Sequence, residues 1–325
     1  MKCLSCYKIQ PGDGYCYACR KRLFANKQMS AVLPFTAPKS ANFSGYQQHT
    51  KQLSISGAQL KYSLAITGNT LQLTDENGIY ILKPVPPSKH LELVGDIPEN
   101  EHITMQMAAQ LFGIKTADNT LVYFQDGEPA YITKRFDRRA EGGKYLQEDF
   151  AQLSARSKFT HGEGYKYDGS YEEIGILLKR FVAASIPALE RFFAIVVFNY
   201  IISNGDAHLK NFSLIRTDAG EYQLTPAYDL MCTVLHTPME SDTALDLYAD
   251  DMNGHYYSTY GHYGRESFLE LAHRLGIQAK RAEKLIDTFL SKQLVMTGFV
   301  NESFLSEQAK LLYIKNFTDK IQRLR

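Results

Sequence analysis

The spacing of apolar residues changes near the middle of the chain, and this change constrains the fold more than any other feature of the sequence. Over residues 53–136, short apolar runs are separated by turn-forming pairs such as Gly68-Asn69 and Asn77-Gly78, which predict tight hairpins. The runs predict strands at 63–66, 71–73, 79–82, 120–124 and 130–136. One helix is expected among them, because Ile103, Met107 and Leu111 repeat at helical spacing.

Helical spacing dominates from Gln147 onward. The expected helices are 147–155, 171–183, 187–204, 266–276, 279–291 and 303–324, with one hairpin near 212–224. The sequence therefore predicts an α+β fold with three parts: a short segment over 1–27, a small sheet-rich lobe over 28–136 and a larger helical lobe over 137–325.

The bulk composition excludes several classes of protein. A hydrophobic fraction of 44% and a charged fraction of 22% are ordinary for a globular chain with a buried core. A formal net charge of +1 provides no global field for a nucleic acid or a membrane, so neither is expected as a direct partner. No run approaches the ~20 apolar residues that span a bilayer, and no apolar signal region opens the chain. A cytoplasmic location with reduced thiols is therefore expected.

Four of the five cysteines form two closely spaced pairs, Cys3-x2-Cys6 and Cys16-x2-Cys19. Two such pairs can supply the four thiolates of a structural zinc site. A redox pair and four free thiols in a flexible tail are the alternatives. Six basic residues against one acid in this segment permit nucleic-acid contact, but a solvated tail explains them more simply. Residues 31–48 are expected to be a linker or irregular loop, and Cys232 a buried core residue.

A candidate site for phosphoryl transfer can be assembled from residues that lie far apart in the sequence. Asp206 and Asn211 are five residues apart after a long apolar helix, which is the spacing of the proton-accepting carboxylate and the metal-binding amide in a kinase loop. Asp229, just after the predicted hairpin, is a candidate second metal ligand. Lys83 at a strand end is a candidate phosphate ligand, and Glu101 on the following helix is a candidate partner for it.

Each of these residues also has a plainer explanation. The 206–211 segment is consistent with a solvated turn, and Lys83 with an ordinary strand-end lysine. Glu101 is consistent with a carboxylate favoured by a helix dipole, and Asp229 with a helix cap. Their order along the chain favours the kinase interpretation.

Four segments resemble the motifs of HipA-like serine/threonine kinases, the toxins of bacterial toxin–antitoxin modules. They are Leu-Ser-Ile-Ser-Gly-Ala-Gln-Leu-Lys at 53–61, Lys-Arg-Phe-Asp-Arg-Arg at 134–139, Asn-Gly-Asp-Ala-His-Leu-Lys-Asn-Phe-Ser at 204–213 and Thr-Pro-Ala-Tyr-Asp at 225–229. The resemblance runs from about residue 53 to the C-terminus. It implies a two-lobed protein-kinase-like fold, ATP and Mg²⁺ as cofactors, and transfer of the γ-phosphate to a serine or threonine of a protein.

The resemblance also implies a role for each matched residue. Asp206 corresponds to the catalytic aspartate, and Asn211 and Asp229 correspond to the Mg²⁺ ligands. Lys83 and His208 correspond to nucleotide contacts, although His208 can equally be a residue that only hydrogen-bonds within the loop. The other implied ATP-binding residues are Ser56, Gly57, Ala58, Gln59 and Lys61 of the phosphate loop, Lys134, Arg135 and Phe136 of the hinge between the lobes, and Lys210.

Ser54 and Ser56 resemble the autophosphorylation sites of this family. A phosphate of about −2 charge on the loop that holds the ATP phosphates repels them, so self-phosphorylation is expected to be inhibitory. The plainer explanation is that both serines favour a tight loop of small residues.

Two departures from related kinases place the chain within the family. The loop around Asp206 lacks the His-Arg-Asp triplet of eukaryotic kinases, and Tyr228-Asp229-Leu230 replaces Asp-Phe-Gly, which both fit the HipA type. Only about 50 residues precede the phosphate loop, as in the shorter HipT-like toxins, in which a separate small protein supplies an N-terminal subdomain. Antitoxin partners are therefore expected, and by family analogy alone the substrate is an aminoacyl-tRNA synthetase.

Two other functions stay open from the sequence. One is a non-catalytic binding module, either a pseudokinase or a zinc ribbon, which the intact Lys83, Asp206, Asn211 and Asp229 argue against. The other is a kinase of a small molecule, for which self-phosphorylation at Ser54 or Ser56 has no evident use.

Overall fold

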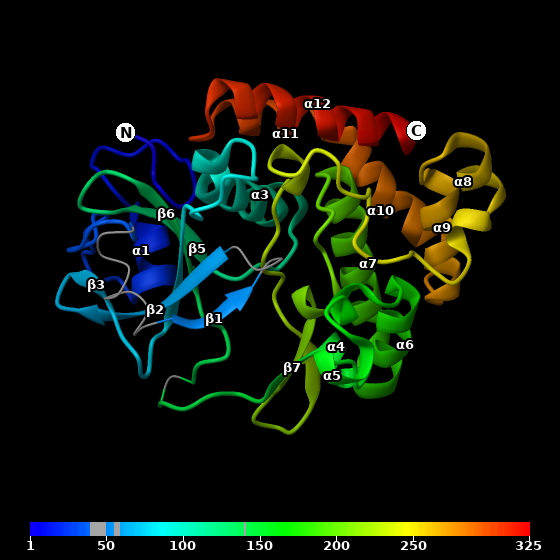
Figure 1. Ribbon diagram of the computed structural model, residues 1–325, viewed down its shortest axis with the longest axis horizontal. Helices are drawn as coiled ribbons and strands as arrows, with labels where there is room; N and C mark the ends of the chain where they lie inside the picture. The colour runs from blue at the N-terminus through cyan, green and yellow to red at the C-terminus, as the bar shows by residue number, and fades with distance from the viewer. Residues whose placement is uncertain (40–49, 55–58, 140) are drawn as a thin grey trace.

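The computed structural model describes residues 1–39, 50–54, 59–139 and 141–325, and it has a sheet-rich part and a helical part (Figure 1). The strands of the main sheet are β1 (Thr50–Ser54), β2 (Gln59–Thr67), β3 (Thr70–Leu73), β4 (Tyr80–Pro84), β5 (Asn119–Tyr123) and β6 (Pro129–Lys134). They lie in the order β1-β2-β4-β6-β5, with β3 also paired to β2, and every neighbouring pair is antiparallel. All five predicted strands are present within a few residues, and β1 is additional.

The two predicted hairpin turns have different outcomes. Gly68, in the left-handed region at φ +62°, joins β2 to β3 as predicted. Asn77-Gly78 does not form a hairpin, because β3 and β4 pair with opposite edges of β2 and not with each other. The turn instead crosses close to β2, where a Cβ atom at Gly78 would lie 1.8 Å from the Ser63 Oγ. Glycine fits at position 78 because Ser63 of β2 approaches too closely for a side chain, and not because of the type of turn.

The longer helices are α3 (Ile97–Phe112), α6 (Tyr171–Phe181), α7 (Ser185–Ile201), α9 (Arg265–Arg274), α10 (Ala279–Ser291), α11 (Gln293–Asn301) and α12 (Glu307–Arg323). The shorter ones are α1 (Tyr17–Phe24), α4 (Phe150–Leu153), α5 (Lys158–His161) and α8 (His255–Tyr260). The 3₁₀ segments are Val94–Asp96, Tyr165–Tyr167, Leu209–Asn211, Thr233–Leu235 and Asp251–Asn253. A second sheet joins β7 (Gln147–Asp149), β8 (Ser213–Arg216) and β9 (Tyr222–Leu224) in that order. None of the described helices is long and apolar enough to cross a bilayer.

The predicted helices are largely confirmed, and 279–291 coincides with α10. The predicted helix 147–155 is wrong in its first half, because Gln147–Asp149 pairs with β8 and Asp149 then caps the short α4. The predicted 303–324 helix begins later, at Glu307, and α11 was not predicted.

The described residues form two hydrophobic cores. One fills the helical part and includes α3, and the other lies between the main sheet and the N-terminal segment. In Figure 1, α12 runs along the top of the molecule above both α3 and α7. The C-terminal helices therefore connect the two parts from outside.

Helix α3 is unusual because half of its buried residues are polar. All twelve residues from Ile97 to Ala108 are buried. Six of them are polar, namely Glu99, Asn100, Glu101, His102, Thr104 and Gln106. Buried polar groups cost free energy unless they are hydrogen-bonded, so the position of α3 depends on specific polar partners.

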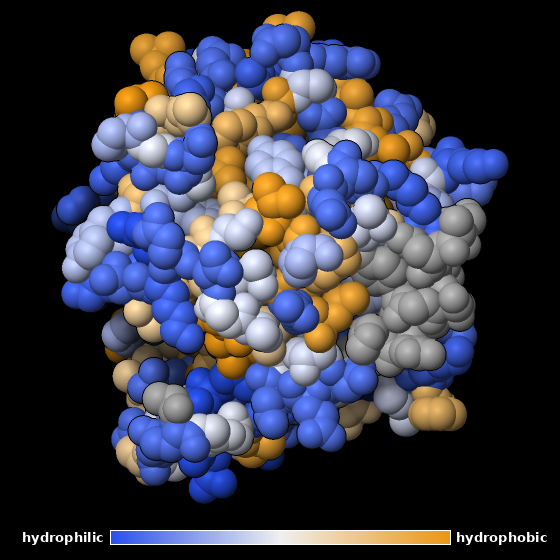
Figure 2. All heavy atoms as spheres, turned by 90° about the vertical axis from the view of Figure 1, so that its left-hand side faces the viewer, coloured by the Kyte–Doolittle hydropathy of each residue, from blue (hydrophilic) through white to orange (hydrophobic). Residues whose placement is uncertain are grey.

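The N-terminal segment is an integral part of the sheet-rich core. Cys3, Cys19 and Leu23 are buried, and Leu33 donates its backbone N–H to the Tyr123 carbonyl at 2.8 Å. The alternative of a flexible tail is therefore wrong. Residues 31–37 form an irregular loop that follows the edge of β5, and residues 40–48 of the predicted linker or loop lie outside the described residues. Figure 2 shows the face that carries this segment, on which apolar residues gather in the centre between hydrophilic ones.

Candidate functional site

Three charged side chains from different elements meet where the sheet faces the helical part. Lys83 on β4 has its Nζ 2.5 Å from the Glu101 Oε1 of α3 and 2.5 Å from the Asp229 Oδ1. Lys83 and Glu101 are each only 2% exposed. The pairing of Lys83 with Glu101 that the sequence suggested is thus confirmed.

The charges around Asp229 favour its ionised form. Burial opposes ionisation, but the Lys61 and Lys83 ammonium groups hold the pKa of Asp229 well below its usual range. Lys61, on β2, contacts the second carboxylate oxygen at 3.2 Å. Burial alone would lower the pKa of Lys83, but Asp229 and Glu101 raise it. Burial raises the pKa of Glu101 to about 7, against the opposing effect of Lys83. Lys83 is therefore an ammonium group and Asp229 a carboxylate at neutral pH.

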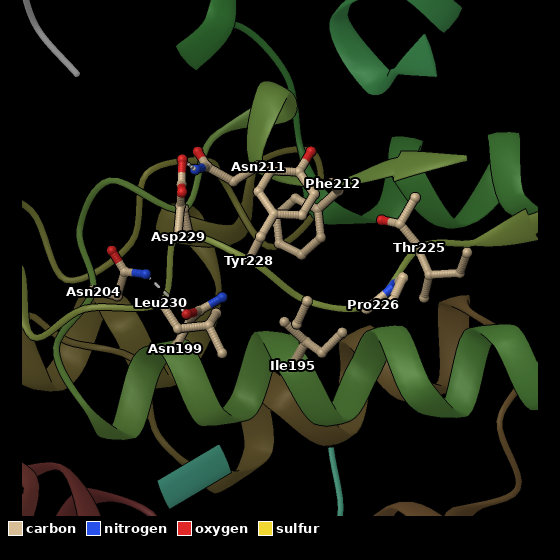
Figure 3. A pocket seen from close by; sticks show the side chains of 13 residues that line it. Ile195, Asn199, Asn204, Asn211, Phe212, Thr225, Pro226, Tyr228, Asp229 and Leu230 are labelled. Carbon is tan, nitrogen blue, oxygen red and sulfur yellow. Dashed lines mark hydrogen bonds between the residues drawn. The ribbon is translucent and has the colours of Figure 1, made fainter. Parts of the chain in front are cut away.

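Asn211 completes this group from the segment after α7. Its Nδ2 lies 3.5 Å from the Asp229 Oδ2, and its Oδ1 accepts the His208 backbone N–H at 3.2 Å. Figure 3 shows the two side chains facing each other above α7, with Asn204 hydrogen-bonded to Asn199 nearby. Asp229 adopts a left-handed backbone conformation at φ 56°, which is costly for a residue other than glycine and is common at functional sites.

Asp206 lies at the start of the same segment but faces another side chain. The Tyr167 hydroxyl donates to the Asp206 Oδ1 at 2.5 Å. The His208 Nε2 lies 3.9 Å from the same oxygen. Burial raises the pKa of Asp206, with Tyr167 acting in the opposite direction. The tyrosine hydroxyl thus occupies a position from which a substrate hydroxyl could donate to this carboxylate.

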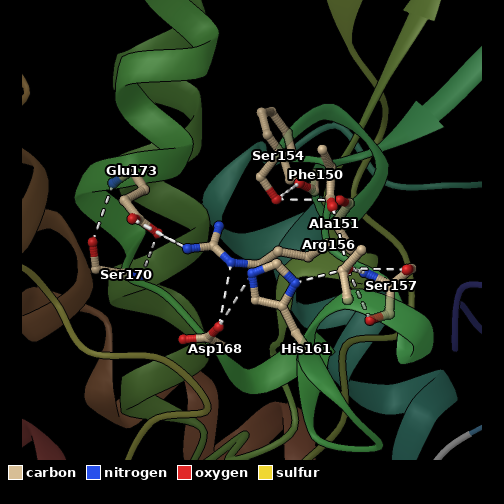
Figure 4. Close-up of polar contacts among 11 residues, drawn as sticks. Phe150, Ala151, Ser154, Arg156, Ser157, His161, Asp168, Ser170 and Glu173 are labelled. Atoms are coloured by element: carbon tan, nitrogen blue, oxygen red, sulfur yellow. Dashed lines mark hydrogen bonds and ion pairs between the residues drawn. The ribbon is translucent and has the colours of Figure 1, made fainter.

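Tyr167 is brought to Asp206 by a loop that an ionic network fastens to α6. Arg156 pairs with Glu173 at 3.1 Å and with Asp168 at 3.6 Å (Figure 4). Asp168 directly follows the 3₁₀ segment Tyr165–Tyr167. The network therefore holds the end of the loop that carries Tyr167.

His208 has an unsatisfied polar atom, since its buried Nδ1 has no hydrogen-bond partner in the described part of the chain. Burial and the nearby Lys166 lower its pKa to about 3, so the imidazole is neutral at physiological pH. A buried polar atom without a partner is costly, which suits a residue that gains a partner when a ligand binds.

These residues line a cleft of about 870 Å³ between the main sheet and the helical part. Lys61, Lys83, Lys134, Arg135, Phe136, His208, Lys210, Asn211 and Asp229 all lie on its wall. A small pocket brings Asp206 together with Lys83, Asn211 and Asp229. Asp206 also lines a second cavity of about 430 Å³, whose wall includes Glu240 and apolar residues such as Leu91 and Met231. Tyr167 lines both the cleft and this second cavity.

The predicted hinge residues lie at the end of β6 and directly after it. The Lys134 backbone N–H donates to the Asp118 carbonyl at 2.7 Å, and that of Arg135 donates to the Ile79 carbonyl at 2.8 Å. The Phe136 ring packs against Tyr228, with ring centroids 5.8 Å apart. Two of the three hinge amides are thus already used within the protein.

The predicted phosphate loop is only partly described. Ser56, Gly57 and Ala58 lie outside the described residues, and Ser54 and Gln59 are described as the paired ends of β1 and β2. Because Lys61 lies two residues after Gln59 and reaches Asp229, this hairpin comes close to the cleft.

The four cysteines form a compact cluster on the outer side of the sheet. The Sγ atoms of Cys3, Cys6, Cys16 and Cys19 all lie within 4.8 Å of one another, and those of Cys6 and Cys16 are 3.7 Å apart. Tetrahedral zinc with Zn–S bonds of ~2.3 Å places sulfur atoms ~3.8 Å apart, so the donor set fits zinc. The Cys16 backbone N–H also points at the Cys3 Sγ at 3.2 Å, a contact that stabilises thiolate ligands.

Sequence reasoning missed several residues of these sites. Tyr167 and Glu240 lie in irregular segments without a recognisable spacing, and only the folded chain brings them to Asp206. Glu240 accepts a hydrogen bond from the Gly205 backbone N–H at 3.3 Å, and burial raises its pKa to about 7.

The chain resembles known proteins along most of its length. The family model described as the HipA-like C-terminal domain matches residues 53–295. A Haemophilus influenzae protein named "Putative kinase" is 26% identical over 92% of this chain and 89% of its own length. "Putative kinase Y4dM" of Sinorhizobium fredii is 32% identical over 72% of this chain, which spans only about half (56%) of that longer protein.

Two solved structures share the fold. HipA of Shewanella oneidensis, in a complex with HipB and operator DNA, aligns with a TM-score of 0.63 and 21% identity, over 90% of this chain and 73% of its own. The Helicobacter pylori proinflammatory kinase CtkA aligns with a TM-score of 0.52 and 16% identity, over 80% of this chain and 90% of its own. The mixed α+β architecture is therefore that of the HipA and CtkA kinases.

Proposed function

Because this chain belongs to the HipA-like C-terminal domain family, we propose that it is an ATP-dependent protein serine/threonine kinase with a two-lobed fold. The observation that carries the proposal is the contact of Lys83 with both Glu101 and Asp229 at 2.5 Å. An active kinase needs a strand lysine paired with a helix glutamate, and a metal-binding aspartate in place beside them. The division into lobes at about residue 136, with residues 1–27 as a cysteine segment packed on the first lobe, is part of the same proposal.

The cleft residues divide into phosphate and metal ligands. Asp229 and the Asn211 Oδ1 would hold Mg²⁺, which would neutralise the charge on the transferred phosphoryl group. Lys83 and Lys61 would contact the phosphates, and Lys210 lines the same wall. Since Lys61 and Lys83 each contact one oxygen of Asp229, binding of Mg²⁺ requires at least one ammonium group to move onto the nucleotide.

The remaining residues would bind the adenine base or close over the phosphates. The backbone of Phe136 is the proposed hinge donor to adenine, because the amides of Lys134 and Arg135 already donate to carbonyls. The buried Nδ1 of His208 is a polar atom that a nucleotide could satisfy. Ser56 to Gln59 would close over the phosphates, and Ser54 or Ser56 would be the self-phosphorylation site.

Asp206 would orient and accept the proton of the acceptor hydroxyl. It shares a small pocket with Lys83, Asn211 and Asp229 and also lines the second cavity, so the acceptor would enter from the side of that cavity. The mostly apolar wall of this cavity suits a polypeptide segment with an apolar side chain next to its serine or threonine. The identity of the protein substrate stays a matter of family analogy.

An antitoxin partner is also proposed by family analogy. Its support is that the structural neighbour from Shewanella oneidensis is described with HipB and its operator DNA. Residues 53–295 are the part of this chain that matches the family, so a partner would act on this part.

The test is mass spectrometry of the purified protein after phosphatase treatment and incubation with Mg-ATP. We expect phosphate on Ser54 or Ser56 in the wild type and none in Asp206→Asn, which removes the proton acceptor but keeps the shape of the side chain. A wild type that neither gains phosphate nor shows thermal stabilisation by Mg-ATP contradicts the kinase proposal.

A further inference from the structure

One residue of α3, His102, makes two hydrogen bonds with the cysteine segment. The Tyr7 hydroxyl and the His102 Nδ1 are 2.7 Å apart, and the His102 Nε2 and the Ser5 carbonyl are 3.1 Å apart. A carbonyl can only accept, so Nε2 carries the ring proton and Nδ1 accepts from Tyr7. Both nitrogens of this buried imidazole are therefore satisfied by two residues of the N-terminal segment.

These two residues flank a cysteine of the cluster, since Ser5 and Tyr7 lie on either side of Cys6. The turn from Cys3 to Lys8 is closed by backbone hydrogen bonds of 2.9 Å and 3.0 Å. Within it Tyr7 adopts a left-handed conformation at φ 63°, which an aromatic residue adopts only when its surroundings impose it. Fixing the Cys3 and Cys6 thiolates on one ion would impose this turn.

An adjacent side of α3 faces the cleft. Glu101, next to His102 in the sequence, makes the 2.5 Å contact with Lys83. The Gln110 side chain adds a 3.4 Å contact to the Cys6 carbonyl two turns further along α3. The cysteine segment and the cleft thus contact neighbouring residues of one helix.

The Tyr7 ring also packs against the C-terminal helical region. Its centroid lies 5.5 Å from that of Phe299 on α11 and 5.3 Å from that of Phe304. Tyr7 thus fills the space between α3 and the C-terminal helices. A displaced turn at Cys6 would withdraw both its hydroxyl and its ring from α3.

We propose that the four cysteines bind one zinc ion, and that this ion holds Ser5 and Tyr7 against His102 and so keeps α3 where Glu101 pairs with Lys83. Zinc would be structural, because four protein thiolates fill its coordination sphere. The statement about catalysis rests on the proposed function, whereas the statements about the metal and the position of α3 do not.

The coupling is partial, because α3 has other polar partners. Asn100 donates to the Cys232 carbonyl at 2.9 Å, and the Thr104 and Tyr313 hydroxyls are 2.8 Å apart. These contacts fasten α3 to the helical part and would remain without zinc. Losing the His102 contacts alone leaves a buried nitrogen unsatisfied, which corresponds to roughly a tenfold rise in local opening of α3.

The test compares two tyrosines of the same segment in the full-length protein. Tyr7→Phe removes the hydroxyl that bonds His102, and Tyr15→Phe removes a buried hydroxyl that bonds the Leu121 carbonyl of β5 at 3.0 Å. Metal content and amide hydrogen exchange of residues 97–112 are measured for both variants and the wild type. We expect one zinc per chain in all three proteins, with exchange of α3 about tenfold faster in Tyr7→Phe only.

A second comparison tests the ion directly. Stripping zinc with a thiol reagent and a chelator should speed exchange of α3, and adding zinc chloride after reduction should reverse it. Cys6→Ser should lose zinc, whereas Cys232→Ala, outside the cluster, should keep it. Absence of bound zinc in the wild type, or equal exchange of α3 in the Tyr7 and Tyr15 variants, overturns the proposal. Because exchange needs no ATP, an inactive wild type counts against the kinase proposal alone.

Discussion

The cysteine cluster and the cleft are built in opposite ways, although both contact α3. The cluster takes its four thiols from residues 3–19, so local turns set its geometry. The cleft takes Lys61 from β2 and Asp229 from a segment 168 residues further along, so only the packing of the two parts brings them together. A locally closed site can be stable by itself, whereas an assembled site is as well ordered as the elements that carry it.

Helix α3 is where this difference matters. It carries six buried polar residues and is placed by polar contacts with the cysteine segment, the sheet and the helical part. Polar contacts are directional, so a small displacement breaks them. The activity of the cleft should therefore be sensitive to changes in α3 that leave the cluster intact.

The largest expected effect follows from removing the charge at the centre of the cleft. Asp229→Asn leaves Lys61 and Lys83 facing a neutral amide and removes a Mg²⁺ ligand. We expect phosphate transfer to fall by about 10³-fold or more, since the metal and its aspartate are required together. Asp287→Asn on the exposed face of α10 is the control and should keep full activity. The zinc content should not change in either variant. A change would contradict the view that the cysteine cluster is built independently of the cleft.

A smaller effect is expected from a matched pair of buried carboxylates on α3. Glu101→Gln removes the charge opposite Lys83, and we expect kcat/KM for ATP to fall by about 10- to 100-fold. Glu99→Gln changes another buried carboxylate of the same helix, for which the described residues provide no lysine partner, and its activity should stay within about twofold of the wild type. Steady-state kinetics at a saturating acceptor concentration measures kcat/KM for both variants. Equal losses of activity in the two variants would mean that the substitutions disturb α3 as a whole, and would contradict a specific role of the ion pair.

Glu240 gives a pH-dependent prediction. Its native pKa of about 7 lies above the ordinary 4.5, so the native state binds more protons between these values and the unfolding free energy falls as pH rises through that window. Glu240→Gln removes the titrating group and with it this pH dependence. We expect the variant to be equal to the wild type near pH 4 and more stable by about 1 to 3 kcal/mol near pH 8. Urea unfolding at both pH values measures the difference in unfolding free energy between the variant and the wild type. A difference that is the same at the two pH values contradicts the prediction.

The smallest effect concerns Tyr167, whose hydroxyl contacts Asp206 at 2.5 Å. An acceptor hydroxyl must donate to the same carboxylate, so Tyr167→Phe should lower the KM for a peptide acceptor by about two- to fivefold, as expected for one neutral hydrogen bond. The KM for ATP should not change. A fall in kcat without a change in KM would show instead that Tyr167 positions Asp206.

The sequence predicted the cysteine cluster and most of the sheet because both depend on short-range patterns. Cys-x2-Cys spacing and apolar runs are visible within a few residues. The charged residues of the cleft were identified from their order along the chain, and the structure brings Lys83, Asn211 and Asp229 together. Their roles in catalysis remain proposals.

What the sequence could not predict depends on tertiary contacts. Strand β7 was taken for the start of a helix, because its pairing partner β8 lies more than 60 residues away. The sequence predicts the cysteine site but not the contacts of Ser5 and Tyr7 with α3, because neither residue belongs to a periodic pattern. Tyr167 has no motif around it and becomes part of the site only when its loop is fastened to α6.

A crystal structure of the protein with Mg²⁺ and a non-hydrolysable ATP analogue tests the central claim most directly. The account predicts a metal ion bound by the Asn211 Oδ1 and Asp229, with Lys83 on the phosphates and still paired with Glu101. It also predicts adenine at the Phe136 backbone and the γ-phosphate on the Asp206 side of the cleft. A nucleotide bound elsewhere, or a metal ion that contacts neither Asn211 nor Asp229, would contradict it.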